Sequence, residues 1–246
     1  MITTTKMSNF QVSEDLMFLK SDENAFSFVH VHEVHHNHLY HVTCSSRDRR
    51  EVKLTQGEWS VTSLLGVTDN TVYFHAQMNP LQQHMYSVSL DTPGVTKQLT
   101  PDGYFHTCTL NHSMTKFASV YSNSHTHYQC AVFCLESGDK LRTITPTLNF
   151  GEVYLKKSSV GSVPSVGGGG EGDNGITTYR YDTPIIEKMR LDEQDVYYMI
   201  YPAKGVDLSQ PQPVLLYVYG GPAIQLVVDR YLVHEIDLHY DSIILS

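Results

Sequence analysis

The chain has few basic residues for its length. Its 246 residues include 17 lysines and arginines against 26 aspartates and glutamates, which gives a formal net charge of −9. Proteins that bind nucleic acids neutralise phosphates with a surplus of lysine and arginine on one face. The one basic run, RDRR at 47–50, lies between two expected strands, and we interpret it as a solvent-exposed hairpin tip. The sequence therefore predicts no nucleic-acid partner.

Cysteine is also scarce. The chain has four cysteines, at Cys44, Cys108, Cys130 and Cys134. The last two lie on one expected strand, too far apart along it to pair, and a chain of this length does not need disulfides to fold. We therefore expect reduced thiols, as in cytoplasmic proteins.

Long apolar segments are missing as well. Residues 1–10, MITTTKMSNF, lack the apolar core of a secretory signal. The longest apolar run, near residues 214–228, is interrupted by Gly220-Gly221-Pro222 and is too short and too broken to cross a bilayer. We expect a cytoplasmic location and no membrane partner.

Short alternating strands, in contrast, recur along the chain. VKLT at 52–55, KQLT at 97–100 and RTIT at 142–145 lie 45 residues apart. HLYHVT at 38–43 and HMYSVS at 84–89 echo each other, and CAVFCL at 130–135 follows 46 residues later. A period of about 40–50 residues built from short strands is typical of β-propeller blades. Three blades are fewer than the roughly four to eight that close a propeller, so we expect an incomplete one.

The first blade is expected over residues 12–57, and the second after the segment Gly57-Glu58-Trp59. Trp59 is interpreted as a packing residue between blades. Turn residues such as those at 91–94, 101–103 and 137–139 separate the expected strands. These strands lie at 15–21, 25–34, 38–44 and 51–55 in the first blade, at 71–77, 84–90 and 95–100 in the second, and at 104–110, 115–122, 129–135 and 140–145 in the third.

The composition changes after the third repeat. Residues 158–175 read SSVGSVPSVGGGGEGDNG, a glycine- and serine-rich sequence typical of flexible linkers. Residues 213–221 are almost continuously apolar, which suits a strand buried on both faces of an α/β sheet. The sequence thus predicts a mainly β chain in three parts: propeller blades over 1–150, a linker over 151–180, and the first strands of an α/β domain over 181–246.

The candidate catalytic residues end the apolar run, in VYGGP at 218–222. A strand that opens into a Gly-Gly loop is one way in which an α/β-hydrolase builds part of its oxyanion hole. Fixed donors must already point at the oxygen on which negative charge develops. The backbone of Gly220 and Gly221 can approach closely, and Tyr219 offers a phenolic hydroxyl as a donor. A strand followed by an ordinary turn is the competing interpretation.

Taken in order, these segments resemble the dipeptidyl peptidase four family of the serine prolyl oligopeptidase clan, and in it the cytosolic branch of dipeptidyl peptidases eight and nine. The resemblance implies the last part of an eight-bladed propeller, the opening strands of an α/β-hydrolase, removal of N-terminal X-Pro or X-Ala dipeptides, and Tyr219 as a donor to the oxyanion. It extends over most of residues 12–228, in the segments EDLMFLKSDE, HLYHVT, GEWSV, TVYFHA, QHMYSVS, TKQLTPDGYFHTC, MIYPAKG and PVLLYVYGGPAIQLV.

The rest of the family's machinery has no counterpart here. α/β-Hydrolases carry serine, acid and histidine after the oxyanion strand, and the chain has no Gly-x-Ser-x-Gly motif. The family's paired glutamates are expected on an earlier propeller segment, and neither Glu33 nor Glu51 is assigned that role. The glycine run at 167–170 and the tail after Val227 depart from the family pattern.

We therefore expect the chain to be a fragment, cut at both ends, that is inactive alone and needs no cofactor. The resemblance implies that the full-length protein takes peptides with a free N-terminus and forms a homodimer. A non-catalytic interaction module, or pseudoenzyme, is the alternative that the absent triad supports.

Histidines gather in one stretch, residues 30–41, which contains six of them. His30 and His32 are expected on one strand face, a spacing at which imidazoles can bind zinc or copper. No aspartate or cysteine nearby completes a set of ligands, and Glu33 is expected on the opposite face. We favour a polar hairpin and keep a metal site as the lesser alternative. His106 is interpreted as a structural or surface residue, since no serine elbow is present for it to serve.

Overall fold

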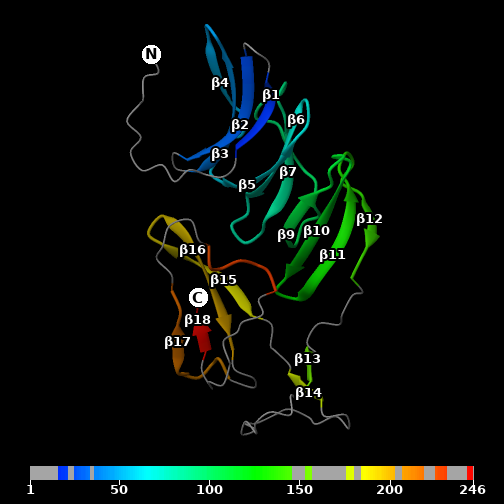
Figure 1. Ribbon diagram of the computed structural model, residues 1–246. Coiled ribbons are helices and arrows are strands. Elements are labelled where there is room, and N and C mark those ends of the chain that lie inside the picture. The colour runs from blue at the N-terminus through cyan, green and yellow to red at the C-terminus, as the bar shows by residue number, and fades with distance from the viewer. Residues whose placement is uncertain are drawn as a thin grey trace. The chain divides into compact units, whose positions relative to one another are not determined.

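A computed structural model shows a chain built of β-strands (Figure 1). The residues that it describes contain no α-helix, and no helix among them is long and apolar enough to cross a membrane. The described residues are 16–21, 25–33, 36–145, 153–156, 176–179, 184–202, 207–218, 225–231 and 243–245.

Three four-stranded sheets follow one another along the chain, and in each the strands pair in sequence order. This meander is the topology of a propeller blade, and it confirms a partial propeller of three blades. The strands are β1 (Leu16–Ser21), β2 (Ala25–Glu33), β3 (Asn37–Ser45) and β4 (Arg49–Lys53); β5 (Ser60–Val67), β6 (Thr71–Gln77), β7 (His84–Ser89) and β8 (Thr96–Gln98); and β9 (Phe105–Leu110), β10 (Lys116–Asn123), β11 (Thr126–Cys134) and β12 (Lys140–Thr143).

The sequence missed one of these strands, β5. Its pairing with β6 slips twice, between Val61 and Ser63 and between Leu64 and Gly66. Each slip inserts a bulge that shifts the side chains to the other face. The alternation of period two, by which a strand is recognised, is therefore broken inside β5.

After the third sheet, the described residues contain six further strands. β13 and β14 form a two-stranded antiparallel pair, and the other four form a sheet in the order β15-β16-β18-β17. In that sheet β15 and β16 are an antiparallel hairpin, whereas β17 pairs with β18 in parallel. The strands are β13 (Val153–Lys156), β14 (Ile176–Tyr179), β15 (Ile185–Leu191), β16 (Gln194–Tyr201), β17 (Val214–Leu216) and β18 (Ile243–Leu245).

The chain divides into two compact units. The first contains the sheets β1–β4 and β5–β8 and much of the third sheet. The second contains residues 103–105, the 120–130 hairpin of β10 and β11, and everything from Thr143 onward.

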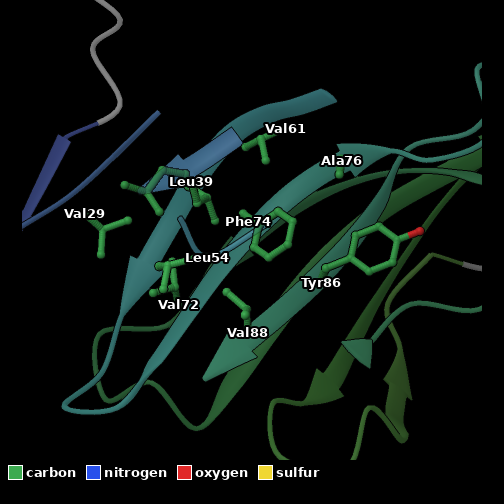
Figure 2. Packing of buried hydrophobic residues seen from close by; sticks show 10 residues of the cluster. Val29, Leu39, Leu54, Val61, Val72, Phe74, Ala76, Tyr86 and Val88 are labelled. Carbon is green, nitrogen blue, oxygen red and sulfur yellow. The ribbon is translucent and has the colours of Figure 1, made fainter. Parts of the chain in front are cut away.

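The core of the first unit lies between its first two sheets (Figure 2). Val29, Leu39 and Leu54 of the first sheet pack with Val72 and Phe74 of the second, and all five are 0% exposed. Burying each such side chain contributes about 1.5–3 kcal/mol. Two adjacent blades are thus joined by a continuous apolar core.

The 45-residue echo corresponds to one repeated contact. In each of the three blade sheets, the threonine that ends the motif accepts a hydrogen bond from a third-strand N–H: Leu39 to Thr55 (2.9 Å), Met85 to Thr100 (3.2 Å) and Cys130 to Thr145 (2.7 Å). The residue before each threonine donates its N–H to the carbonyl of the same partner: Leu54 to Leu39 (2.8 Å), Leu99 to Met85 (2.8 Å) and Ile144 to Cys130 (2.7 Å).

The histidines of this motif share the contact in two of the three sheets. The Nδ1 atoms of His38 and His84 lie 3.1 and 3.0 Å from the Oγ1 atoms of Thr55 and Thr100. In the third sheet Cys130 makes the N–H contact that Leu39 and Met85 make in the first two, so Gln129 corresponds to His38 and His84. The third echo therefore begins at Gln129, one residue earlier than the sequence comparison placed it.

Replacing Thr100 with valine is expected to destabilise the first unit by about 1–3 kcal/mol, because the N–H of Met85 and the ring of His84 lose a buried partner. Thr100 is only 4% exposed, and valine has nearly the same shape. Urea unfolding measures the change. Thr107→Val, at an exposed strand position, is the matched control and should stay within about 0.5 kcal/mol of the parent. Equal losses in both variants would contradict a role for the threonine contact.

Two tight turns lie where the sequence predicted them, at 91–94 and 137–139. Gly94 and Gly138 have φ angles of 87° and 81°, a region that side chains other than glycine disfavour. At Gly138 a Cβ atom would also lie 3.0 Å from the carbonyl oxygen of Leu99. Glycine is thus required here by both backbone conformation and space.

Trp59 packs as the sequence predicted. Its ring stacks on Phe74 with centroids 6.4 Å apart and meets His38 edge-on at 5.2 Å. It borders the core shared by the first two sheets.

Candidate functional site

The sequence predicted that the apolar run leading to the candidate site is a strand buried on both faces. This prediction is wrong. The strand is short, Val214–Leu216, and its side chains are 49–64% exposed. Within the described residues its only strand neighbour is β18. An apolar strand of a parallel sheet is buried by helices that cover both faces, and the described part of the chain supplies none.

The three candidate oxyanion residues, Tyr219, Gly220 and Gly221, lie outside the described residues. The described chain stops at Val218, which is 72% exposed, and resumes at Gln225. Their role therefore stays a prediction of the sequence.

The segment that follows the candidate loop is firmly held, although the sequence there departs from the family pattern. Val227 and Val228 are 5% and 4% exposed. Two hydrogen bonds flank Arg230: the N–H of Ser124 donates to Asp229 Oδ1 (2.8 Å), and the N–H of Tyr231 donates to Ser122 Oγ (3.1 Å).

Ring contacts reinforce this attachment. The ring of Tyr231 lies 4.6 Å from that of His127 and 5.8 Å from that of Tyr128. The guanidinium of Arg230 lies 5.6 Å from the ring centroid of Phe105, within the range of a cation–π contact. We call residues 225–231 and their partners on the β10–β11 hairpin the clasp.

Sequence reasoning missed the clasp. Both of its hydrogen-bond donors are backbone N–H groups, and its partners are separated by 105 and 109 residues. A backbone donor leaves no signature in residue type, so no motif could have indicated the pairing.

The hairpin β15–β16 carries an exposed charge cluster. Lys188 and Arg190 each lie 2.9 Å from Asp195. Hydrogen bonds from the two cations hold the pKa of Asp195 below its usual value, and the bond to Asp195 raises the pKa of Lys188. Exposed pairs of this kind are screened by water, and the cluster has the character of a solvated surface.

The histidine-rich segment is an aromatic face of the first sheet. In the first sheet His30 of β2 pairs with Tyr40 of β3, and in the second sheet Phe74 of β6 pairs with Tyr86 of β7. His30 therefore occupies the position in the first sheet that Phe74 occupies in the second. Its ring lies 5.8 Å from Tyr40, and its Nε2 lies 3.7 Å from Glu51. Burial lowers the pKa of His30, an effect that Glu51 partly opposes.

No group of three or more histidine, cysteine, aspartate or glutamate side chains is arranged to hold a metal ion in the described part of the chain. His35, one of the six clustered histidines, lies outside it. All four cysteines are free thiols in the structure. Burial raises the pKa of the Cys108 thiol to about 12, so this cysteine is a core residue rather than a nucleophile.

Of the two interpretations of His106, structural or surface residue, the structure supports the structural one. It is 0% exposed; its Nδ1 lies 2.9 Å from Ser119 Oγ and its Nε2 lies 3.0 Å from the carbonyl oxygen of Pro101. Burial lowers its pKa to about 3. Nearby, His75 Nε2 accepts the N–H of Cys108 at 3.0 Å, and burial lowers the pKa of His75 to about 4. Both rings stay neutral. The His75 bond links the second sheet to the third, and the ring of His106 lies 5.5 Å from that of His84 in the second sheet.

Comparison with known proteins agrees with the three-sheet architecture. The family described as the dipeptidyl peptidase IV N-terminal region matches residues 3–128, just over half of the chain.

Curated relatives extend the match. Dipeptidyl peptidase 8 from Homo sapiens is 28% identical over 191 residues, which cover 74% of this chain and 19% of the relative. Probable dipeptidyl peptidase 4 from Emericella nidulans is 25% identical, over 79% of this chain and 22% of the relative. Prolyl endopeptidase FAP from Homo sapiens is 20% identical, over 75% of this chain and 22% of the relative.

The chain spans about a fifth of the length of the curated relatives that it matches. Family match, repeat architecture and relatives agree: the chain belongs to the dipeptidyl peptidase IV family, whose N-terminal region it carries.

Proposed function

We propose that this chain is part of a serine-type dipeptidyl peptidase that removes X-Pro or X-Ala dipeptides from peptides with a free N-terminus. The observation that carries the proposal is the family match over residues 3–128. Its support beyond that region is the order of the parts: three blades, then β-rich segments, then VYGGP at 218–222. We propose that residues 181–246 are the opening of an α/β-hydrolase domain.

In this function Tyr219 hydrogen-bonds the oxygen that becomes negative as the scissile carbonyl is attacked. The backbone of Gly220 and Gly221 shapes the loop beside it. Such donors act through preorganisation, because they already point at the charge before it develops. The serine, acid and histidine that perform acyl transfer are expected in sequence after this strand, so the 246 residues alone are proposed to be inactive.

The proposed partners are a peptide substrate and, for the full-length protein, a second copy of itself. A cytoplasmic location is proposed from the four free cysteines. The competing function, a non-catalytic interaction module, gains support from the exposed apolar residues 214–218. A surface of this kind suits a protein contact.

Reading the transcript past the codon of Ser246 tests the proposal. The peptidase function predicts that a Gly-x-Ser-x-Gly motif follows in frame, with an acid and a histidine after it. An in-frame stop directly after Ser246 in the mature transcript would favour the interaction module instead.

A further inference from the structure

A pocket of about 260 Å³ is lined by the first sheet and by the turn that follows β7. Its apolar lining comes from Val52 of β4 and from Leu90 and Pro93 of the turn. Pockets for drug-sized ligands measure roughly 300–1,000 Å³, so this one has room for a smaller molecule. All of its lining residues belong to the first unit.

The turn that lines the pocket is held in place. The N–H of Gly94 donates to the carbonyl oxygen of Leu54 (2.9 Å), which fastens the turn to the residue directly after β4. The side chain of Asp91 is held as well, because Asn70 Nδ2 donates to its Oδ2 at 2.9 Å. The pocket is therefore already formed without a ligand, which lowers the entropic cost of binding one.

Two opposite charges border this pocket without neutralising each other. Arg50 and Asp91 both line it, yet no ion pair joins them in the described part of the chain. The neighbouring cation, Arg49, instead pairs with Glu51 at 2.9 Å and does not line the pocket. Single exposed charges are well solvated in water. What distinguishes Arg50 and Asp91 is the partly apolar pocket that they share, which suits a molecule with one charge of each sign.

His41 also borders the pocket. Burial lowers the pKa of its ring, which is therefore neutral at pH 7 and carries one N–H. Its Nε2 is buried and has no hydrogen-bond partner among the described residues. An unpaired buried N–H is rarer than an unpaired buried acceptor, so the proton belongs on Nδ1. A ring with an N–H to donate suits a ligand that brings an oxygen acceptor.

We propose that this pocket binds a small zwitterion with an apolar side chain. Its carboxylate pairs with Arg50, whose guanidinium can donate two parallel hydrogen bonds to it. Its ammonium pairs with Asp91, and its side chain lies against Val52 and Leu90. Free amino acids and dipeptides share this chemistry. The site goes beyond the proposed peptidase function and does not depend on it.

Isothermal titration calorimetry of the whole chain with L-leucine and with the dipeptide Gly-Pro tests the proposal. At least one of these probes should bind with a Kd below about 1 mM, and the tighter one identifies the source as a free amino acid or a dipeptide. The N-acetylated form of that probe lacks the ammonium, and its amide lacks the carboxylate. Each blocked form should bind about tenfold more weakly, because it leaves one charged group of the pocket without its partner.

Two variants assign the two charges. Arg50→Gln should weaken binding of the unblocked probe about tenfold and remove the difference between that probe and its amide. Asp91→Asn should weaken binding about equally and remove the difference between the probe and its N-acetylated form. Each variant thus cancels the effect of one blocking group and preserves the effect of the other.

Arg49→Gln and Asp139→Asn are the matched controls, and both should bind the probe within about twofold of the parent. Asp139 occupies a similar turn, because its N–H donates to Ser137 Oγ as that of Asp91 donates to Ser89 Oγ, but it does not line the pocket. Equal losses in the controls would show that the charge of the whole surface, and not the pocket, governs binding.

The blocked probes keep the proposal testable even where a variant does not fold, since they are titrated into the parent chain. Absence of binding by both L-leucine and Gly-Pro would overturn the site. Blocked forms that bind as tightly as the unblocked probe would overturn the zwitterion and the roles of the two charges.

Discussion

Replacing Tyr219 with phenylalanine is expected to lower kcat by about 100- to 1000-fold, the usual effect of removing one oxyanion donor. The variant is made in the protein that is translated when the reading frame continues past Ser246, called the in-frame protein below. KM should change little, because the hydroxyl acts on charge that exists only in the transition state. Steady-state hydrolysis of Gly-Pro-p-nitroanilide measures both constants. The phenyl ring preserves the apolar part of the side chain, so the variant removes the donor and little else.

Tyr217→Phe is the matched control for this variant. Tyr217 lies two residues earlier in the same apolar run and is 49% exposed. It has no proposed role, and its kcat should stay within about twofold of the parent. If both variants lost activity equally, the effect would come from the segment as a whole, and the assignment of Tyr219 would be wrong.

When the pH falls from 7 to 5, His106 and His75 are each expected to destabilise the first unit by about 2 kcal/mol. Their folded-state pKa values, about 3 and about 4, lie below the ordinary value of 6.5. The unfolded chain therefore binds protons first as the pH falls. The stability that these neutral rings contribute is complete above pH 6.5 and is lost progressively between pH 6.5 and about 3–4.

Urea unfolding at the two pH values measures this effect. His106→Gln keeps polar atoms for Ser119 and Pro101 but cannot titrate, so about 2 kcal/mol of the pH-dependent loss should disappear. His112→Gln, at an exposed turn position, is the control and should retain the whole loss. A His106→Gln variant whose stability fell as far as the parent's would show that the buried rings do not govern acid sensitivity.

The sequence predicted the strands best where side chains alternate and where residues that favour turns separate one strand from the next. β6, β7 and β10 fall close to their expected ranges, since period-two alternation and turn residues are local signals. β5 was missed because two bulges break that alternation. The threonine echo was visible because the same hydrogen bond is repeated in all three blade sheets and needs the same residue type.

The candidate site was less accessible to sequence reasoning. The exposure of Val214 and Leu216 depends on what covers the strand, which the run of apolar residues does not reveal. The clasp depends on backbone donors paired across more than 100 residues. The role of Tyr219 follows from a family resemblance carried by few residues, and it stays a prediction.

The measurement that tests the central claim most directly is dipeptide release by the in-frame protein, followed by mass spectrometry. The substrate is a peptide that begins Gly-Pro, supplied with either a free or an acetylated N-terminus. We predict that the free peptide loses one Gly-Pro dipeptide, that the acetylated peptide stays intact, and that the 246-residue chain alone cleaves neither. A folded in-frame protein that releases no dipeptide from the free peptide would contradict the assignment of this chain to a dipeptidyl peptidase.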